Sequence, residues 1–194
     1  MKEEHRNATR RTRLLGGAAI SLMALAASSG LAAAAPVREC SDMQILSEPD
    51  AVIEAAELVP AGAAPGNPDL PEHCLLQGMI DPRTGADGAQ YGIGFDLRMP
   101  TEWNGRFVFQ GGGGLDGLLN PAYGDIFGTL DPSALERGFA VVSTDGGHRS
   151  DTNIDASFAA DQQARIDYAY NAMDRATETG KALVEHYYGA APDY

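Results

Sequence analysis

The sequence predicts an α/β fold, in which helices pack against one sheet. Three observations carry this prediction. Residues 74–99 contain two apolar runs of strand type, residues 106–144 contain two more, and residues 161–188 have the periodicity of a long amphipathic helix. The chain has 194 residues, of which 44% are hydrophobic and 21% charged, so it is long enough for one domain and unlike a disordered chain.

The first 35 residues have the composition of an export signal. Residues 1–13 hold five basic and two acidic residues, residues 14–35 hold no charge, and residues 32–35 are all alanine, which suits a signal peptidase. We therefore assign residues 1–35 to a signal peptide, and residues 9–14 resemble a twin-arginine motif. General secretory export is the alternative route, and a retained anchor is the alternative to cleavage, since the apolar stretch could span a bilayer. Either export route makes residues 36–194 secreted or periplasmic.

Charge and cysteine content narrow the class of protein further. The net charge is -13, and because residues 1–35 carry +3, the remaining 159 residues carry -16. Such an acidic chain repels nucleic-acid phosphates, so we expect no nucleic-acid partner and no membrane partner after signal cleavage. Cys40 and Cys74 are the only cysteines, which favours a disulfide in an oxidising compartment. Two buried free thiols are the alternative, whereas zinc would need more ligands than the nearby His73.

The first half of the mature chain predicts a short helix and a hairpin. Apolar positions across residues 41–60 predict a helix, interrupted by prolines at 49 and 60, and residues 60–71 are rich in proline and glycine, as in a loop. Residues 74–80 form an apolar run, and residues 91–99 alternate strictly between apolar and other residues. Turn residues lie between these two runs, so they predict an antiparallel hairpin.

The second half predicts strand, helix, strand and helix. Residues 106–110 read as a strand, and Asp131 followed by Pro132 predicts the capped start of a helix. Residues 139–144 read as another strand. The strongest helical pattern spans residues 161–188, with a predicted buried stripe at Ile166, Tyr170, Met173, Thr177, Gly180, Val184 and Tyr187.

Four consecutive glycines, residues 111–114, follow the strand at residues 106–110. Without Cβ atoms, their backbone N–H groups can approach a ligand closely, as in the oxyanion loops of α/β-hydrolases. The spacing Gly112-x-Gly114-x-x-Gly117 also fits a dinucleotide fingerprint, but that motif must open a helix at once and this segment continues as a loop. An oxyanion loop is therefore the favoured interpretation, with a purely structural turn as the alternative.

Other side chains indicate catalysis or metal binding less clearly than the glycine run indicates an oxyanion loop. Asp145 and His148 follow the strand at residues 139–144, where α/β sheets place their sites, and could be a catalytic pair or metal ligands. Structural roles are favoured over both, with the aspartate capping the Gly-Gly turn and the histidine only satisfying a backbone group. His73 and His186 are taken as incidental. No serine lies in a Gly-x-Ser-x-Gly elbow, so the chain by its own residues is not a complete hydrolase.

Five segments resemble the tannase and feruloyl esterase family. They are residues 70–74, residues 98–107, the glycines at 111–114, residues 144–148 and residues 161–167. The resemblance runs in order along nearly the whole mature chain. It implies the N-terminal part of an α/β-hydrolase fold, with a mixed, mostly parallel sheet and flanking helices, truncated before the nucleophile elbow.

The resemblance also implies a function and two kinds of site residue. Members are secreted serine esterases that cleave small esters of aromatic acids, and a lid domain outside this segment carries structural calcium. Gly114 matches the residue whose N–H helps to form the oxyanion hole, and Cys40 and Cys74 match a family disulfide. The catalytic triad is absent from the chain, and no cofactor or metal site is expected in it. A non-catalytic secreted remnant or binding module is the alternative function.

Overall fold

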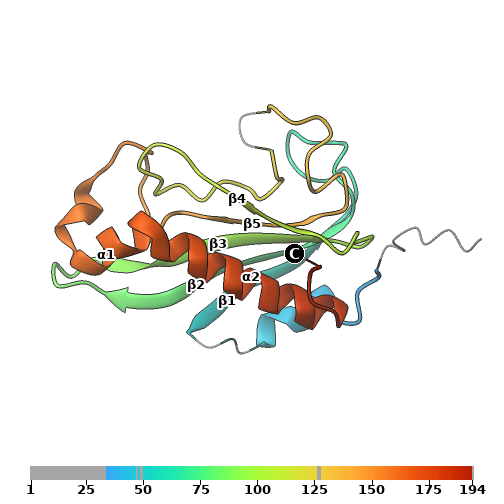
Figure 1. Ribbon diagram of the computed structural model, residues 1–194, viewed down its shortest axis with the longest axis horizontal. Helices are drawn as coiled ribbons and strands as arrows, with labels where there is room; N and C mark the ends of the chain where they lie inside the picture. Colours follow the sequence, from blue (N-terminus) through green and yellow to red (C-terminus); the bar gives the residue numbers. More distant parts are fainter. Residues whose placement is uncertain (1–33, 47, 49, 126–127, 194) are drawn as a thin grey trace, which may run out of the picture. The chain divides into compact units, whose positions relative to one another are not determined.

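The computed structural model describes residues 34–46, 48, 50–125 and 128–193 (Figure 1). Nearly all of the predicted signal peptide therefore lies outside the described residues, and its assignment stays a prediction. Within the described part, no helix is both long and apolar enough to cross a membrane.

The core of the structure is one five-stranded sheet with the order β1-β2-β3-β5-β4. The hairpin predicted from residues 74–99 is confirmed, and so are the strands predicted around residues 106–110 and 139–144. The strands are β1 (Ala51–Val59), β2 (His73–Thr84), β3 (Gln90–Pro100), β4 (Phe107–Gln110) and β5 (Ala140–Thr144).

The sheet is mixed, as predicted, but its parallel part is small in the described residues. β1, β2 and β3 pair antiparallel, and β3 also pairs antiparallel with β5. Only β4 and β5 run parallel, with Gln110 opposite Ser143. A short turn joins β2 to β3 and forces them antiparallel, whereas the long segment between β4 and β5 allows a parallel crossover. The mostly parallel character that the resemblance implied is thus confined here to one strand pair.

The helix predicted across residues 41–60 is wrong. A short 3₁₀ helix, η1 (Cys40–Ile45), is followed by strand β1. The β1 register runs from Ala51 opposite Ile80 to Val59 opposite His73, with an irregularity after Ile53. Its β-branched side chains suit a strand, and pairing with β2, distant in sequence, decided between the two conformations.

The long helix predicted from residue 161 to 188 is present but interrupted. It comprises α1 (Gln162–Ile166), a π-helical turn η3 (Asp167–Asn171) and α2 (Ala172–Tyr188), preceded by the short 3₁₀ helix η2 (Ser157–Ala160). The predicted stripe is partly wrong, because Tyr170 and Met173 are exposed. The π turn adds a residue to one turn and so rotates the buried face relative to an unbroken α-helix.

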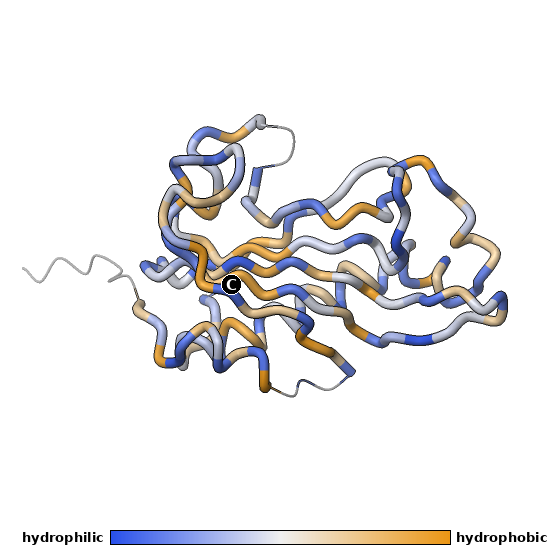
Figure 2. The backbone as a smooth tube through the Cα atoms, turned by 180° about the vertical axis from the view of Figure 1, so that it is seen from behind, coloured by the Kyte–Doolittle hydropathy of each residue, from blue (hydrophilic) through white to orange (hydrophobic). Residues whose placement is uncertain are grey.

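One face of the sheet is covered by α2, as Figure 1 shows. Gly180 allows the close approach, since a Cβ there would lie 3.0 Å from the ring of Phe107. Figure 2 views the sheet from the opposite side. There, the loops before β2 and β5 contribute Leu70, Ala122 and Leu135 to a second apolar cluster around Val141.

The helix predicted to begin at Asp131 is wrong. The peptide bond between Asp131 and Pro132 is cis, and the segment forms a single turn. Within that turn, the N–H of Ser133 donates to Glu136 and the N–H of Glu136 donates back to the Ser133 hydroxyl. This is a capping box, but Gly138 with φ 83° ends the turn before a helix can extend.

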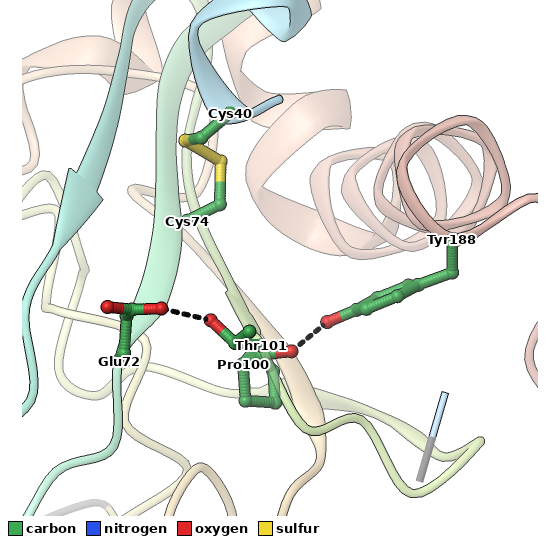
Figure 3. The surroundings of a disulfide bond; sticks show 6 residues. All are labelled: Cys40, Glu72, Cys74, Pro100, Thr101 and Tyr188. Carbon is green, nitrogen blue, oxygen red and sulfur yellow. Dashed lines mark hydrogen bonds between the residues drawn. A yellow bond between two sulfur atoms is a disulfide. The ribbon is translucent and has the colours of Figure 1, made fainter. Parts of the chain in front are cut away.

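A disulfide joins Cys40 in η1 to Cys74 in β2, as Figure 3 shows. Close to it, the Tyr188 hydroxyl donates to the carbonyl of Pro100 over 2.6 Å, and its ring stacks on Trp103 with centroids 4.3 Å apart. Burial raises the pKa of the Tyr188 hydroxyl, so it remains a donor. These contacts fasten both η1 and the end of α2 to the same end of the β2–β3 hairpin.

Candidate functional site

Two glycine-rich loops leave the sheet at the same edge. Residues 111–114 follow β4, and Gly146 and Gly147 follow β5. Because β4 and β5 are parallel neighbours, their carboxyl ends lie side by side, which is where α/β sheets place their sites. The N–H of Gly117 donates to the carbonyl of Asp145 over 2.8 Å and joins the two loops directly. The loop with Asp145 and His148 therefore lies at the carboxyl end of a parallel strand, as predicted from the sequence.

Gly114 occupies a position that only glycine fits. Its φ is 68°, in the left-handed region, and a Cβ there would lie 2.6 Å from the carbonyl oxygen of Asn153. Gly114 is exposed, and among the described residues its N–H has no hydrogen-bond partner. The N–H that the family resemblance singles out is thus free to bind a ligand atom.

Asp116 lies between the two glycine loops. One of its carboxylate oxygens lies 2.6 Å from the position that a Cβ on Gly112 would occupy. The Cβ of Asp116 lies 3.1 Å from the position that a Cβ on Gly146 would occupy. Burial raises the pKa of Asp116, against the opposing effects of the Gly113 N–H and of His148. Its own φ of 47° is uncommon for a residue with a side chain. Both loops therefore need glycine to accommodate one carboxylate.

The Asp145 side chain joins the second glycine loop to strand β3. Its Oδ1 accepts the N–H of Gly94 over 3.0 Å and the N–H of Gly147 over 2.9 Å. The side chain is fully buried, Oδ2 has no hydrogen-bond partner among the described residues, and the Nε of Arg149 lies 3.9 Å from it. Burial raises the pKa of Asp145 to about 7. Asp145 is in the capping role favoured from the sequence, and it is closed to a substrate in this chain.

His148 is also buried, and it does not pair with Asp145. Its ring stacks on Phe158 with centroids 3.8 Å apart, and neither ring nitrogen has a hydrogen-bond partner among the described residues. Burial lowers the pKa of His148, which keeps the ring neutral. The packing of His148 agrees with a structural role, but the expected hydrogen bond to a backbone group is not found among the described residues.

A hollow of about 210 Å³ lies beside the first glycine loop, bounded by residues 110–113, 116, 118, 120–121, 123, 125 and 153. Residues 120–121, 123 and 125 form one wall of this hollow, and buried side chains of the sheet hold that segment in place. Asp96 accepts the N–H of Ala122, and Gln110 accepts the N–H of Gly124. The Ser143 hydroxyl donates to the carbonyl of Asn120. The wall is therefore fixed by three neighbouring strands rather than by the loop alone.

His73 belongs to a buried polar network rather than to a metal site. Arg98 donates from Nε to Asp96 over 2.9 Å and from Nη1 to His73 Nε2 over 2.9 Å. An arginine can only donate, so Nδ1 of His73 carries the proton and donates to the carbonyl of Pro71. His186 lies elsewhere, 2.8 Å from Glu48. No group of three metal-ligating side chains is found in the described parts of the chain.

Sequence reasoning missed Asp116, Asn153 and Tyr168, which all contact the first glycine loop. The dipeptide Asp116-Gly117 is a turn signal, but nothing local predicts that its carboxylate is buried between two loops. The Tyr168 hydroxyl donates to the carbonyl of Gly114, 54 residues away. No local pattern in the sequence reports a contact of that separation.

Comparison with known proteins identifies the family. The family model described as tannase and feruloyl esterase matches residues 76–194. The chain belongs to this family. Four of the five segments that carried the resemblance lie wholly within the matched residues. The segment at residues 70–74 lies just before them.

Individual relatives agree with this assignment. The chain is 51% identical over 130 residues to the mono(2-hydroxyethyl) terephthalate hydrolase of Piscinibacter sakaiensis, a match that covers 64% of this chain and 22% of that protein. It is 35% identical over 195 residues to an uncharacterized esterase of Xanthomonas campestris, covering 93% of this chain and 30% of that protein. The chain thus spans less than a third of the length of either relative.

Solved structures support the fold class. The crystal structure of feruloyl esterase B from Aspergillus oryzae matches with a TM-score of 0.61 and 26% identity, over 77% of this chain and 29% of that chain. This chain therefore shares its α/β fold, with a mixed sheet and a covering helix, with part of that structure.

Proposed function

We propose that this chain forms the N-terminal part of the catalytic domain of an exported serine carboxylic ester hydrolase. Its substrates are small esters of aromatic acids, the class that the names of its relatives indicate. The nucleophilic serine and its histidine and aspartate partners come from residues after Tyr194, in a Gly-Cys-Ser-x-Gly-Gly elbow and beyond it. The export signal at residues 1–35 delivers the enzyme to the periplasm or the medium.

In the proposed reaction, the serine hydroxyl attacks the ester carbonyl while histidine removes its proton. The carbonyl oxygen becomes an oxyanion, which accepts hydrogen bonds from the Gly114 N–H and from a second N–H at the elbow. Collapse of this intermediate expels the alcohol, protonated by histidine, and leaves the acyl group on serine. Water then attacks the acyl-enzyme by the same steps and releases the acid.

One observation supports Gly114 most strongly. Gly114 is exposed and its N–H has no partner among the described residues, while the Gly113 carbonyl of the same peptide group and both ends of the next peptide group are hydrogen bonded. A donor that is uncommitted but held in place stabilises developing negative charge without first reorganising.

The test is turnover of aromatic esters by the full-length protein and its Gly114→Ala variant. Alanine at 114 would meet the Asn153 carbonyl, so the peptide must move and the donor is misplaced. We expect kcat to fall on the order of 10²–10³-fold. Gly88→Ala is the matched control, because Gly88 also has a positive φ but no atom within 4 Å of its Cβ position. Wild-type turnover in Gly114→Ala would refute the role.

The 194-residue chain alone is expected to be catalytically inactive, because it contains no nucleophile elbow. Esterase activity in the purified chain, absent from a mock preparation, would overturn the proposed division of the active site. Sequencing the gene beyond codon 194 tests the same point. An open frame that encodes the elbow agrees with an esterase, whereas a stop codon at that position agrees with a non-catalytic remnant.

A further inference from the structure

The π-helical turn η3 packs directly against both glycine loops. In this turn, the buried Asp167 accepts hydrogen bonds from Gln163 over 2.9 Å and from Asn171 over 2.8 Å, one turn before it and one after. A Cβ on Gly147 would lie only 2.5 Å from the Cβ of Asp167, so the second glycine loop rests on the turn. Single π turns are rare and often lie at functional sites.

Tyr168, the next residue of the turn, reaches the first glycine loop. Its hydroxyl donates to the carbonyl oxygen of Gly114 over 2.8 Å. Its ring packs beside the stacked pair of Phe158 and His148, with its centroid 5.0 Å from that of Phe158 and 6.1 Å from that of His148. The aromatic contacts hold the ring, so the hydroxyl can fix the loop instead of following its motion.

The peptide group between Gly114 and Leu115 is held at both ends. Its oxygen accepts the Tyr168 hydroxyl, and its N–H donates to the carbonyl of Asn153 over 3.0 Å. The preceding peptide group is held through the carbonyl of Gly113, which accepts the N–H of Asp116 over 3.3 Å. The Gly114 N–H belongs to this preceding peptide group, which is planar and is joined at the Gly114 Cα to the group that Tyr168 holds. The bonds on the two groups together define the orientation of the Gly114 N–H.

We propose that Tyr168 is a positioning residue that keeps the Gly114 N–H oriented toward the oxyanion of the reaction. This inference rests on the proposed function. The hydroxyl contacts the Gly114 carbonyl rather than the substrate, so its contribution passes through the backbone. Precise oxyanion sites need a donor whose position is fixed. A side chain from a separate element, which holds the backbone on which the donor lies, gives this kind of support.

The experiment compares Tyr168→Phe with Tyr170→Phe in the full-length esterase. Tyr168→Phe removes one hydroxyl and keeps the ring against Phe158 and His148. Tyr170 lies on the same π turn but is 63% exposed, and among the described residues it has no hydrogen bond to the loop, so its variant is the matched control. We expect kcat of Tyr168→Phe to fall roughly 3- to 10-fold, the effect of one hydrogen bond, with KM and melting temperature unchanged.

Two further readouts separate positioning from a general structural role. Amide hydrogen exchange of the peptide that covers residues 111–118 should quicken in Tyr168→Phe and not in Tyr170→Phe. In addition, the losses of kcat in Tyr168→Phe and Gly114→Ala should not add in the double variant, because both act on one N–H.

The outcomes distinguish this inference from the proposed function. An active wild-type enzyme whose Tyr168→Phe variant keeps wild-type kcat and exchange would overturn the inference and leave the esterase assignment intact. A variant that loses activity only in step with a lower melting temperature would also overturn it. An inactive wild-type protein would overturn both.

Discussion

Asp145 accepts the backbone N–H of Gly94 over 3.0 Å, which joins the loop after β5 to the middle of strand β3. A Cβ on Gly94 would lie 2.3 Å from the second carboxylate oxygen, Oδ2, so glycine is needed for this contact. Since Oδ2 is buried without a hydrogen-bond partner among the described residues, ionisation of Asp145 is costly. This relationship makes the stability of the second glycine loop depend on pH.

Asp145→Asn should remove part of that dependence. The pKa of Asp145 is about 7 in the folded state against 3.8 for the free side chain, so the folded state holds the proton more tightly. Stability from this group is therefore present below pH 4 and is lost as pH rises toward 7. Urea unfolding at pH 4.5 and 7.5 should show that Asp145→Asn gains stability relative to wild type at the higher pH, on the order of a few kcal/mol.

The comparison must separate Asp145 from His148. Burial lowers the pKa of His148, so its contribution has the opposite sign and stability falls as pH drops below about 6.5. Both proteins carry His148, so its effect cancels in the difference between them. A difference between wild type and Asp145→Asn that does not change with pH would contradict the prediction.

Arg98→Met should destabilise the fold by about 3–5 kcal/mol, because it leaves the buried Asp96 without its ionic partner. Arg175→Met is the matched control, since Arg175 makes partly exposed ion pairs with Asp50 and Asp81, and its loss should cost less than about 1 kcal/mol. Free energies of unfolding from urea titration would measure both. Equal costs for the two variants would mean that the buried network adds nothing to stability.

Replacing both Cys40 and Cys74 by alanine should lower the free energy of unfolding by about 3–4 kcal/mol. The disulfide closes a loop between residues 34 positions apart, which restricts the unfolded chain. The check is a urea titration of the oxidised wild type and the double variant. The glycine loops lie at the far end of strand β5 from this bond, so kcat of the full-length esterase should stay unchanged at a temperature where both proteins are folded. Equal unfolding free energies would show that the bond is energetically neutral.

The sequence predicted the elements that local pattern determines. The strict alternation of residues 91–99 identified β3, and the four glycines after β4 identified the exposed loop that contains Gly114. β1 was missed because its conformation depends on pairing with β2, and the helix at Asp131 was wrong because its capping box closes only one turn.

The contacts around Gly114 could not be predicted for a related reason. Asp116, Asn153 and Tyr168 come from three separate segments and meet only after the sheet has formed. The π turn that carries Tyr168 has no sequence signature distinct from that of an ordinary helix. Sequence pattern therefore located the loop, whereas its hydrogen-bond partners required the fold.

The placement of the Asp116 carboxylate between Gly112 and Gly146 has a consequence for how such sequences can diverge. A methyl group at position 112 would need the space that the carboxylate fills, so substitution there should be accompanied by a shorter residue at 116. Position 146, where φ is 81°, requires glycine whatever residue stands at 116. Evolutionary change at positions 112 and 116 is therefore expected to be correlated, with glycine kept at position 146.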